Sequence, residues 1–272
     1  MRIKKTILTV IAAAIVITAM AQAAVAHSLW INVTDHQPAF RAKFGAQTKT
    51  YIGWGHRQPV QDFLSADTLL EYSLIDPLGR KTAIEPAEKA GFLSAQVQMK
   101  KPGAYVVSVV RKPGFYTMYE QDGAIRHFSG PKTGLPNIIL SNHFEQYAKS
   151  LIAVGDPSEK DFQTPIGHKL EIIPLAHPAT LKGNGAHFLP MQILFDGKPA
   201  RFVQVLATYG GFSTADDYAF ATVADGQGIA KIRILQRGTW LIKANLKTPP
   251  PENMKELCDG MNYTATMTFE IP

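Results

Sequence analysis

The chain has 272 residues, of which 46% are hydrophobic, 18% charged and 10% aromatic. This is the composition of a globular protein, and it excludes a disordered, collagen-like or coiled-coil chain. The formal net charge is +6, but Arg2, Lys4 and Lys5 carry half of it. The other basic residues form no stripe interleaved with aromatic residues, so we expect no nucleic-acid partner.

Residues 1–26 have the pattern of a secretory signal peptide. A basic start is followed by an apolar run over residues 7–19 and by small residues up to Ala26. Cleavage after Ala26 fits this pattern, although cleavage after Ala21 or Ala23 would also satisfy it. No later apolar run reaches the roughly 18 residues of a membrane helix. We therefore expect an exported protein, periplasmic or secreted, that does not span the membrane.

Short runs rich in β-forming residues fill the first half of the mature chain. They are separated by turns of Gly, Pro and Asp, which is the pattern of consecutive strands. Residues 143–151 differ, because their apolar side chains recur at helical spacing, although a loop that leads into a strand at 150–154 fits equally well. The expected strands are residues 51–53, 69–75, 92–99, 105–111 and 125–128.

The second half predicts strands more clearly. Asp196-Gly197 lies between two β-rich runs, and this dipeptide is a strong signal for a hairpin. The expected strands are residues 191–195, 201–208, 229–235, 239–246 and 263–271.

Strands at about ten-residue spacing predict an all-β protein built from antiparallel β-sandwiches. The polar segment 156–165, with two prolines, is the expected junction. We predict a signal peptide at 1–26, an N-terminal sandwich at 27–160 and a C-terminal sandwich of immunoglobulin-like or transthyretin-like type at 161–272. The single cysteine, Cys258, cannot form an intrachain disulfide, so the hydrophobic cores must stabilise the fold.

His27 is the first candidate metal ligand. Signal peptide cleavage after Ala26 would make it the amino terminus, where its α-amine and imidazole can chelate one metal ion. A further imidazole would complete a three-nitrogen site, called a histidine brace. Such a nitrogen-rich tetragonal site suits Cu(II) or Ni(II) better than tetrahedral Zn(II).

Three further histidines are candidate ligands. His56 follows Gly53-Trp54-Gly55 and precedes Pro59, so it should lie where a strand ends and the backbone turns. Either His187 or His143 could supply another imidazole, and sequence spacing does not choose between them. The chain has no GxSxG, HExxH or paired CxxC motif, so hydrolase and zinc-enzyme functions have no support.

The mature chain resembles a family of exported proteins, long of unknown function, that are encoded beside bacterial nickel and cobalt uptake systems. The similarity covers essentially the whole mature chain. It includes the start motif at residues 26–30, the Gly-Trp-Gly-His motif at 53–56, residues 170–174 and 194–199, and the tail at 258–269. The resemblance implies a metal-handling β-sandwich protein rather than an enzyme, with His27 and His56 as ligands.

We therefore expect a periplasmic protein that binds Ni(II) or Co(II) and hands the metal to an inner-membrane transporter. One alternative is a Cu(II) protein with the same brace, either a chaperone or a polysaccharide monooxygenase, which would be an enzyme. A second alternative is a metal-free module for adhesion or glycan binding.

Overall fold

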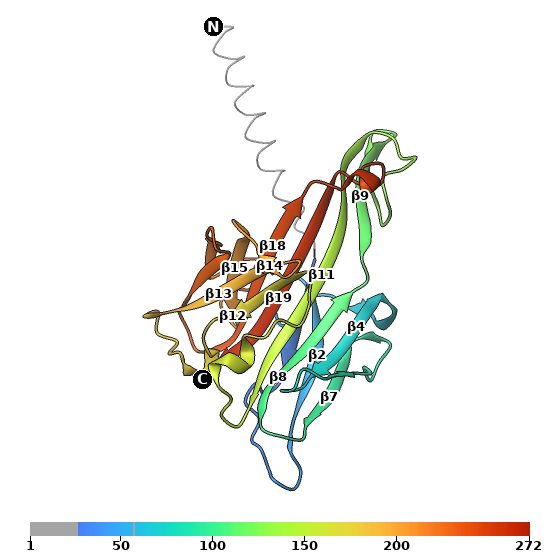
Figure 1. The fold of residues 1–272 in the computed structure, drawn as a ribbon. Helices are drawn as coiled ribbons and strands as arrows, with labels where there is room; N and C mark the ends of the chain where they lie inside the picture. Colours follow the sequence, from blue (N-terminus) through green and yellow to red (C-terminus); the bar gives the residue numbers. More distant parts are fainter. Residues whose placement is uncertain (1–26, 57) are drawn as a thin grey trace.

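The computed structural model describes residues 27–56 and 58–272, so the predicted signal peptide lies outside the described residues (Figure 1). The described chain is built of β-strands and short 3-10 turns and contains no α-helix. No helix in this part of the chain is long and apolar enough to cross a membrane. The turns are η1 (Ala66–Thr68), η2 (Glu159–Phe162), η3 (Pro178–Thr180) and η4 (Glu252–Met254).

One large sheet runs through the molecule and contains strands from both halves of the chain. Its central pair, β11 and β19, is parallel, whereas the neighbouring pairs are antiparallel. A hairpin of β9 (Gly114–Gln121) and β10 (Ala124–Phe128) extends it along the first part of β11. The other strands lie in the order β16 (Phe220–Val223), β15 (Gln204–Tyr209), β18 (Gly238–Thr248), β19 (Gly260–Ile271), β11 (Ile138–Val154), β8 (Gly103–Arg111), β4 (Leu69–Ile75) and β5 (Lys81–Ala83).

A smaller sheet packs against one side of the large sheet, which we call the N-terminal side. Its strands are β1 (Ser28–Val33), β2 (Ala46–Gly55) and β7 (Ser94–Met99). A separate hydrophobic core, which includes Leu29, Ile52, Val107 and Ile152, fills the space between the two sheets. A two-stranded ladder of β3 (Leu64–Ser65) and β6 (Ala90–Gly91) lies apart from these sheets.

Hydroxyl groups fix β1 on the large sheet. Thr266 Oγ1 donates to the Leu29 carbonyl over 2.6 Å, and Thr268 Oγ1 donates to the Ile31 carbonyl over 2.7 Å. Among the described strands, β1 pairs with β2 alone, so these buried bonds satisfy backbone groups of β1 that β2 does not reach. The strand that follows His27 is therefore held firmly on the large sheet.

A third sheet covers the opposite side, which we call the C-terminal side. It contains β12 (Leu170–Pro174), β13 (His187–Phe195), β14 (Lys198–Pro199) and β17 (Ile229–Ile234). A second core, with Met191, Ile232, Trp240 and Phe269, lies between it and the large sheet. The β-sandwich prediction is confirmed, with the large sheet common to both sandwiches. The domain boundary near residue 160 stays a prediction.

The helical interpretation of residues 143–151 is wrong, because these residues lie within β11. Every residue from Gln146 to Val154 is buried, since β11 is a central strand with a core on each side. A strand buried on both sides loses the apolar–polar alternation that identifies most strands. Its sequence then resembles that of a buried helix.

The predicted Asp196-Gly197 hairpin is confirmed. Both residues have positive φ, and Phe195 pairs with Lys198 across the turn. The second strand of the hairpin differs from the prediction, because β14 is only two residues long. The chain then crosses to β15, which pairs with β18 in the large sheet.

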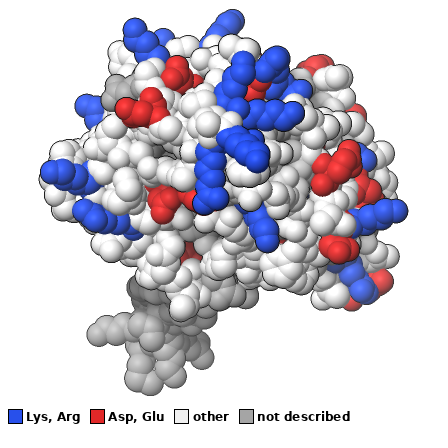
Figure 2. All heavy atoms as spheres, turned by 90° about the horizontal axis from the view of Figure 1, so that it is seen from below, with Lys and Arg blue, Asp and Glu red and all other residues white. Residues whose placement is uncertain are grey.

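Figure 2 shows one face of the molecule, on which several Lys and Arg side chains gather in the middle and Asp and Glu side chains lie mostly to either side.

Candidate metal centre

The pairing of β1 with β2 places His27 beside His56. Ser28 pairs with Gly55, so the preceding residue, His27, meets the residue that follows Gly55. The two imidazole ring centroids are 4.6 Å apart, with 37° between the ring planes. Two residues far apart in sequence thus form one imidazole pair at the end of the sheet.

The two glycines of the Gly-Trp-Gly-His motif make this arrangement possible. A Cβ atom on Gly53 would lie 2.1 Å from Nε1 of Trp30, so only glycine lets the Trp30 ring lie against β2. Gly55 has a φ of +124°, which other residues rarely adopt. The chain bends there, and the His56 N–H donates to Gln61 Oε1 over 2.7 Å.

The loop after His56 is fixed from two directions. The Pro59 carbonyl accepts hydrogen bonds from Trp30 Nε1 at 3.0 Å and from Asn32 Nδ2 at 2.8 Å. The Asp62 N–H donates to the Trp54 carbonyl over 3.0 Å. These bonds bring the Asp62 carboxylate to 3.8 Å from Nε2 of His27.

Trp54 is the aromatic platform of the site. The His27 ring stacks on it with a centroid distance of 5.4 Å and an interplanar angle of 14°. The Arg111 guanidinium lies 4.5 Å from the Trp54 ring centroid and 4.7 Å from that of Phe144. Burial lowers the pKa of Arg111, which nevertheless stays charged at neutral pH because arginine titrates far above it. The site therefore contains a fixed positive charge.

Gln146 connects the backbone of His27 to the large sheet. Its Nε2 donates to the His27 carbonyl over 2.6 Å, and the side chain is almost fully buried. Because β11 is central and rigidly packed, this bond fixes the position of the His27 backbone.

The side chains in place provide an incomplete metal site. Within residues 27–56 and 58–272, no group of three or more His, Cys, Asp or Glu side chains has the arrangement to hold a metal ion. His27 and His56 offer two imidazoles, and the Asp62 carboxylate approaches only His27. A metal ion here needs at least one more donor from the protein or from a ligand.

The structure does not bring His143 or His187 to this pair. His143 lies on β11 three residues before Gln146, so its side chain points to the C-terminal side of the sheet, where it contacts Phe115. His187 is exposed at the start of β13, opposite Ile234. Neither residue can supply the further imidazole in this conformation.

The remaining histidines have roles elsewhere in the fold. His36 bonds to the Leu151 carbonyl, His168 to Ser108, and His127 to Tyr116. His177 accepts from the Ala179 N–H at the start of η3.

Sequence reasoning missed Trp54, Asp62, Arg111 and Gln146 as parts of the site. Only Trp54 carried a local signal, as the centre of the Gly-Trp-Gly-His motif. Asp62 and Gln146 are common polar residues without a motif, and Arg111 ends an ordinary strand. Their convergence depends on the packing of one sheet against another, which brings together residues as far apart as His27 and Gln146, 119 positions along the chain.

Residues 24–248 match the family described as "Domain of unknown function (DUF4198)". No curated protein matches the chain significantly. Among solved structures, the D0-D1 domain of intimin is similar at 12% sequence identity and a TM-score of 0.23. The alignment covers 89% of this chain and 97% of the intimin chain. Murine CEACAM1b is 8% identical, with coverage of 90% and 98% and a TM-score of 0.20. Scores this low carry no functional argument.

Proposed function

The chain belongs to the DUF4198 family, and we propose that it is an exported protein that captures a divalent transition metal, Ni(II) or Co(II), at the His27–His56 pair. The observation that carries this proposal is the contact of two histidines, 4.6 Å apart, at the predicted start of the mature chain. Neutral imidazoles are common ligands for Ni(II) and Cu(II).

Signal peptide cleavage after Ala26 would supply the missing donor. The new α-amine belongs to the same residue as one of the two imidazoles, so it would lie within reach of the same ion. The proposed ligands are the His27 amine and imidazole and the His56 imidazole, with Asp62 orienting the His27 ring as carboxylates commonly do for metal-bound histidines. The precursor would lack this amine, so metal capture would begin after export.

The exposure of the site suits release as well as capture. The His27 side chain is 43% exposed and that of Asp62 is 57% exposed, so a partner can approach the ion directly. Meanwhile, Gln146 and Trp54 keep the donors in place. We propose that an inner-membrane transporter receives the metal here.

The decisive experiment is calorimetric titration of protein that begins at His27 with Ni(II), Co(II), Cu(II) and Zn(II). We expect 1:1 binding, and we expect His27→Ala and His56→Ala to weaken it by at least tenfold. The matched controls are His143→Ala and His187→Ala, which remove histidines outside the pair and should leave the affinity unchanged.

A second protein with one alanine added before His27 tests the role of the amine. The added residue converts the amine to an amide and leaves both imidazoles in place. We expect a loss of affinity of at least tenfold. Unchanged affinity would remove the amine from the ligand set, and 1:1 binding that survives both His27→Ala and His56→Ala would refute the site.

A second candidate function is that of a copper polysaccharide monooxygenase. Two exposed aromatic rings next to the site favour it. Phe63, adjacent to Asp62, packs edge-to-face on Phe92 at 5.0 Å, and both rings are about half exposed. Such rings can contact a sugar face. Cu(II) also binds nitrogen sites more tightly than Ni(II).

Activity separates this candidate from metal capture. Ascorbate-driven cleavage of chitin or cellulose by the copper-loaded protein, lost in Phe63→Ala, would establish the oxygenase. No cleavage, together with 1:1 Ni(II) binding, would support capture.

A further inference from the structure

A cavity of about 300 Å³ adjoins the imidazole pair on the N-terminal side of the large sheet. His56 forms part of its wall. β15, β18 and β19 contribute most of the lining, and the segment between β15 and β16 adds Asp216 and Tyr218. This part of the sheet extends beyond β19, the last strand that β1 covers.

A buried lysine lies in the cavity wall. Lys243, on β18, is only 6% exposed, and no hydrogen bond or ion pair joins it to a described residue. Buried lysines normally have a charged or polar partner, because an isolated buried ammonium group is unfavourable. Burial also lowers the pKa of Lys243 to about 8, so the side chain is mainly charged at neutral pH. Among the described residues, no carboxylate forms an ion pair with the Lys243 ammonium group.

The rest of the lining can complete the recognition of an anion. Lys247, four residues further along β18, adds a second positive charge. The Asn262 and Gln204 amides add N–H donors, whereas Asn245 Nδ2 already donates to Asn262 Oδ1 within the wall. Burial and the nearby Asp216 raise the pKa of Tyr218 to about 12, so its hydroxyl remains a donor. With Asp216 as the only acidic group in the lining, positive charge exceeds negative charge.

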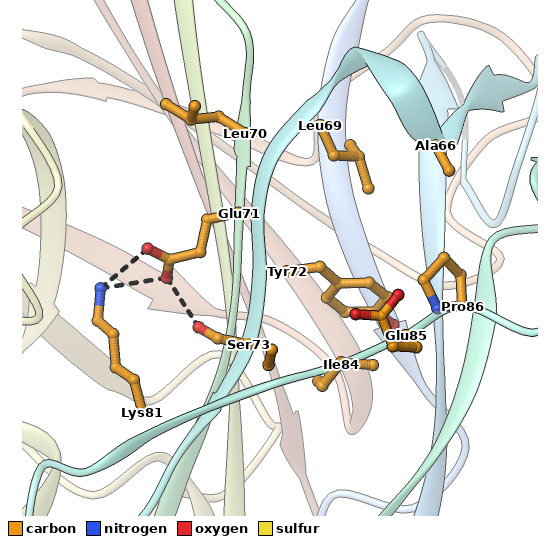
Figure 3. A pocket seen from close by; sticks show the side chains of 11 residues that line it. Ala66, Leu69, Leu70, Glu71, Tyr72, Ser73, Lys81, Ile84, Glu85 and Pro86 are labelled. Carbon is orange, nitrogen blue, oxygen red and sulfur yellow. Dashed lines mark hydrogen bonds and ion pairs between the residues drawn. The ribbon is translucent and has the colours of Figure 1, made fainter.

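A larger pocket over β4 and β5 contains a lysine that, unlike Lys243, has a carboxylate partner (Figure 3). It measures about 420 Å³. There, Lys81 bonds to both oxygens of Glu71 at 3.1 Å, and Glu71 also accepts from Ser73. The charges of Lys81 and Glu71 thus compensate each other within the protein, whereas the charge of Lys243 has no such partner among the described residues.

We propose that the cavity binds a small dicarboxylate, with one carboxylate on Lys243 and the other directed toward His56. The first part depends on the cavity alone. The second part rests on the proposed metal site, because the outer carboxylate would complete the coordination of an ion held by the two imidazoles. Oxygen donors from a ligand can join imidazoles around Ni(II) or Co(II).

The first test omits metal. Protein that begins at His27 is titrated with succinate by calorimetry at pH 7, before and after Lys243→Met, which removes the charge and keeps the length. The matched control is Lys231→Met, which removes an exposed lysine on β17. We expect 1:1 binding that weakens at least tenfold in Lys243→Met only.

A phosphate titration distinguishes a dicarboxylate site from a general anion site. Phosphate binding that equals or exceeds succinate binding would overturn the dicarboxylate assignment. Succinate binding that is absent, or that is unchanged in Lys243→Met, would overturn the site itself. Circular dichroism of each variant confirms that the fold is retained.

The second test measures Ni(II) affinity with and without saturating succinate. We expect at least a fivefold gain that Lys243→Met abolishes. No gain would overturn the bridging part of the proposal, even if metal and succinate each bind. If His27→Ala abolishes Ni(II) binding but leaves succinate binding intact, the anion site at Lys243 is independent of the metal site. Failure of one proposal can then be told apart from failure of the other.

Discussion

Two buried lysines on opposite sides of the large sheet have contrasting surroundings. Lys149, on β11, points to the C-terminal side and donates to Glu171 over 2.7 Å. Lys243, on β18, points to the N-terminal side and has no such partner among the described residues. Both side chains are at least nine-tenths buried, so each ammonium group loses a similar amount of hydration. The two lysines differ in whether a carboxylate offsets that loss.

The Lys149 environment forms a complete network. Glu171 also accepts from the Ile166 and Gly167 N–H groups. Burial alone would raise the pKa of Glu171, but Lys149 and these hydrogen bonds hold it below its usual value. A satisfied network of this kind supports the structure, whereas an unsatisfied buried charge in a cavity indicates a ligand. Predictions on stability test this distinction.

Removing the partner of Lys149 should have the largest effect. Glu171→Gln leaves the lysine charge buried without compensation, and we expect a loss of about 3–5 kcal/mol in the free energy of unfolding, measured with urea. The double variant Lys149→Met/Glu171→Gln should recover most of it, because the glutamine oxygen still accepts from the backbone. A loss below about 1 kcal/mol in the single variant would show that the network is not structural.

Acid should weaken the same region. Burial and the nearby Lys149 lower the pKa of His168 to about 4, although Glu171 and Glu71 oppose this shift. Between pH 6.5 and 4 the unfolded chain therefore binds a proton that the folded chain does not, so stability falls as the pH falls. We expect His168 to contribute about 3 kcal/mol of this loss. Urea titrations across this range should show a smaller slope in His168→Gln, and an unchanged slope would contradict the assignment.

Removing the charge of Lys243 should raise the free energy of unfolding rather than lower it. Lys243→Met replaces an unpartnered ammonium group with an apolar chain, and we expect about 2 kcal/mol of added stability at pH 7. Because the pKa of Lys243 is lowered to about 8 from 10.5, its destabilising effect should disappear as the pH rises through this range. The gain in Lys243→Met should therefore shrink toward pH 10. A variant less stable than the parent protein would indicate that Lys243 has a structural partner.

Replacing Lys81 should have the smallest effect on the free energy of unfolding. Its ion pair with Glu71 lies in the pocket of Figure 3, and the lysine side chain is 45% exposed. Solvent screens such pairs, so Lys81→Met should cost about 0.5 kcal/mol by the same urea titration. A loss as large as that of Glu171→Gln would mean that exposure does not separate the two ion pairs.

Local patterns predicted much of the fold. Runs rich in β-forming residues identified β4, β17 and β18, and Asp196-Gly197 identified a turn whose positive φ angles the structure contains. The prediction failed at residues 143–151, where burial on both sides removes the alternation. It also could not show that β15 leaves its hairpin to join the large sheet, because nothing in a strand's own residues specifies its partner.

His27 and His56 were identifiable from the sequence because each has local support, one from the predicted cleavage site and one from the glycines around Trp54. His143 and His187 had no such support, and the structure places them away from the pair. The convergence of His27 with His56, Asp62 and Gln146 and the cavity beside Lys243 depend on strand register and on which side of a sheet each side chain faces. Those are properties of paired strands, so only the tertiary structure could decide them.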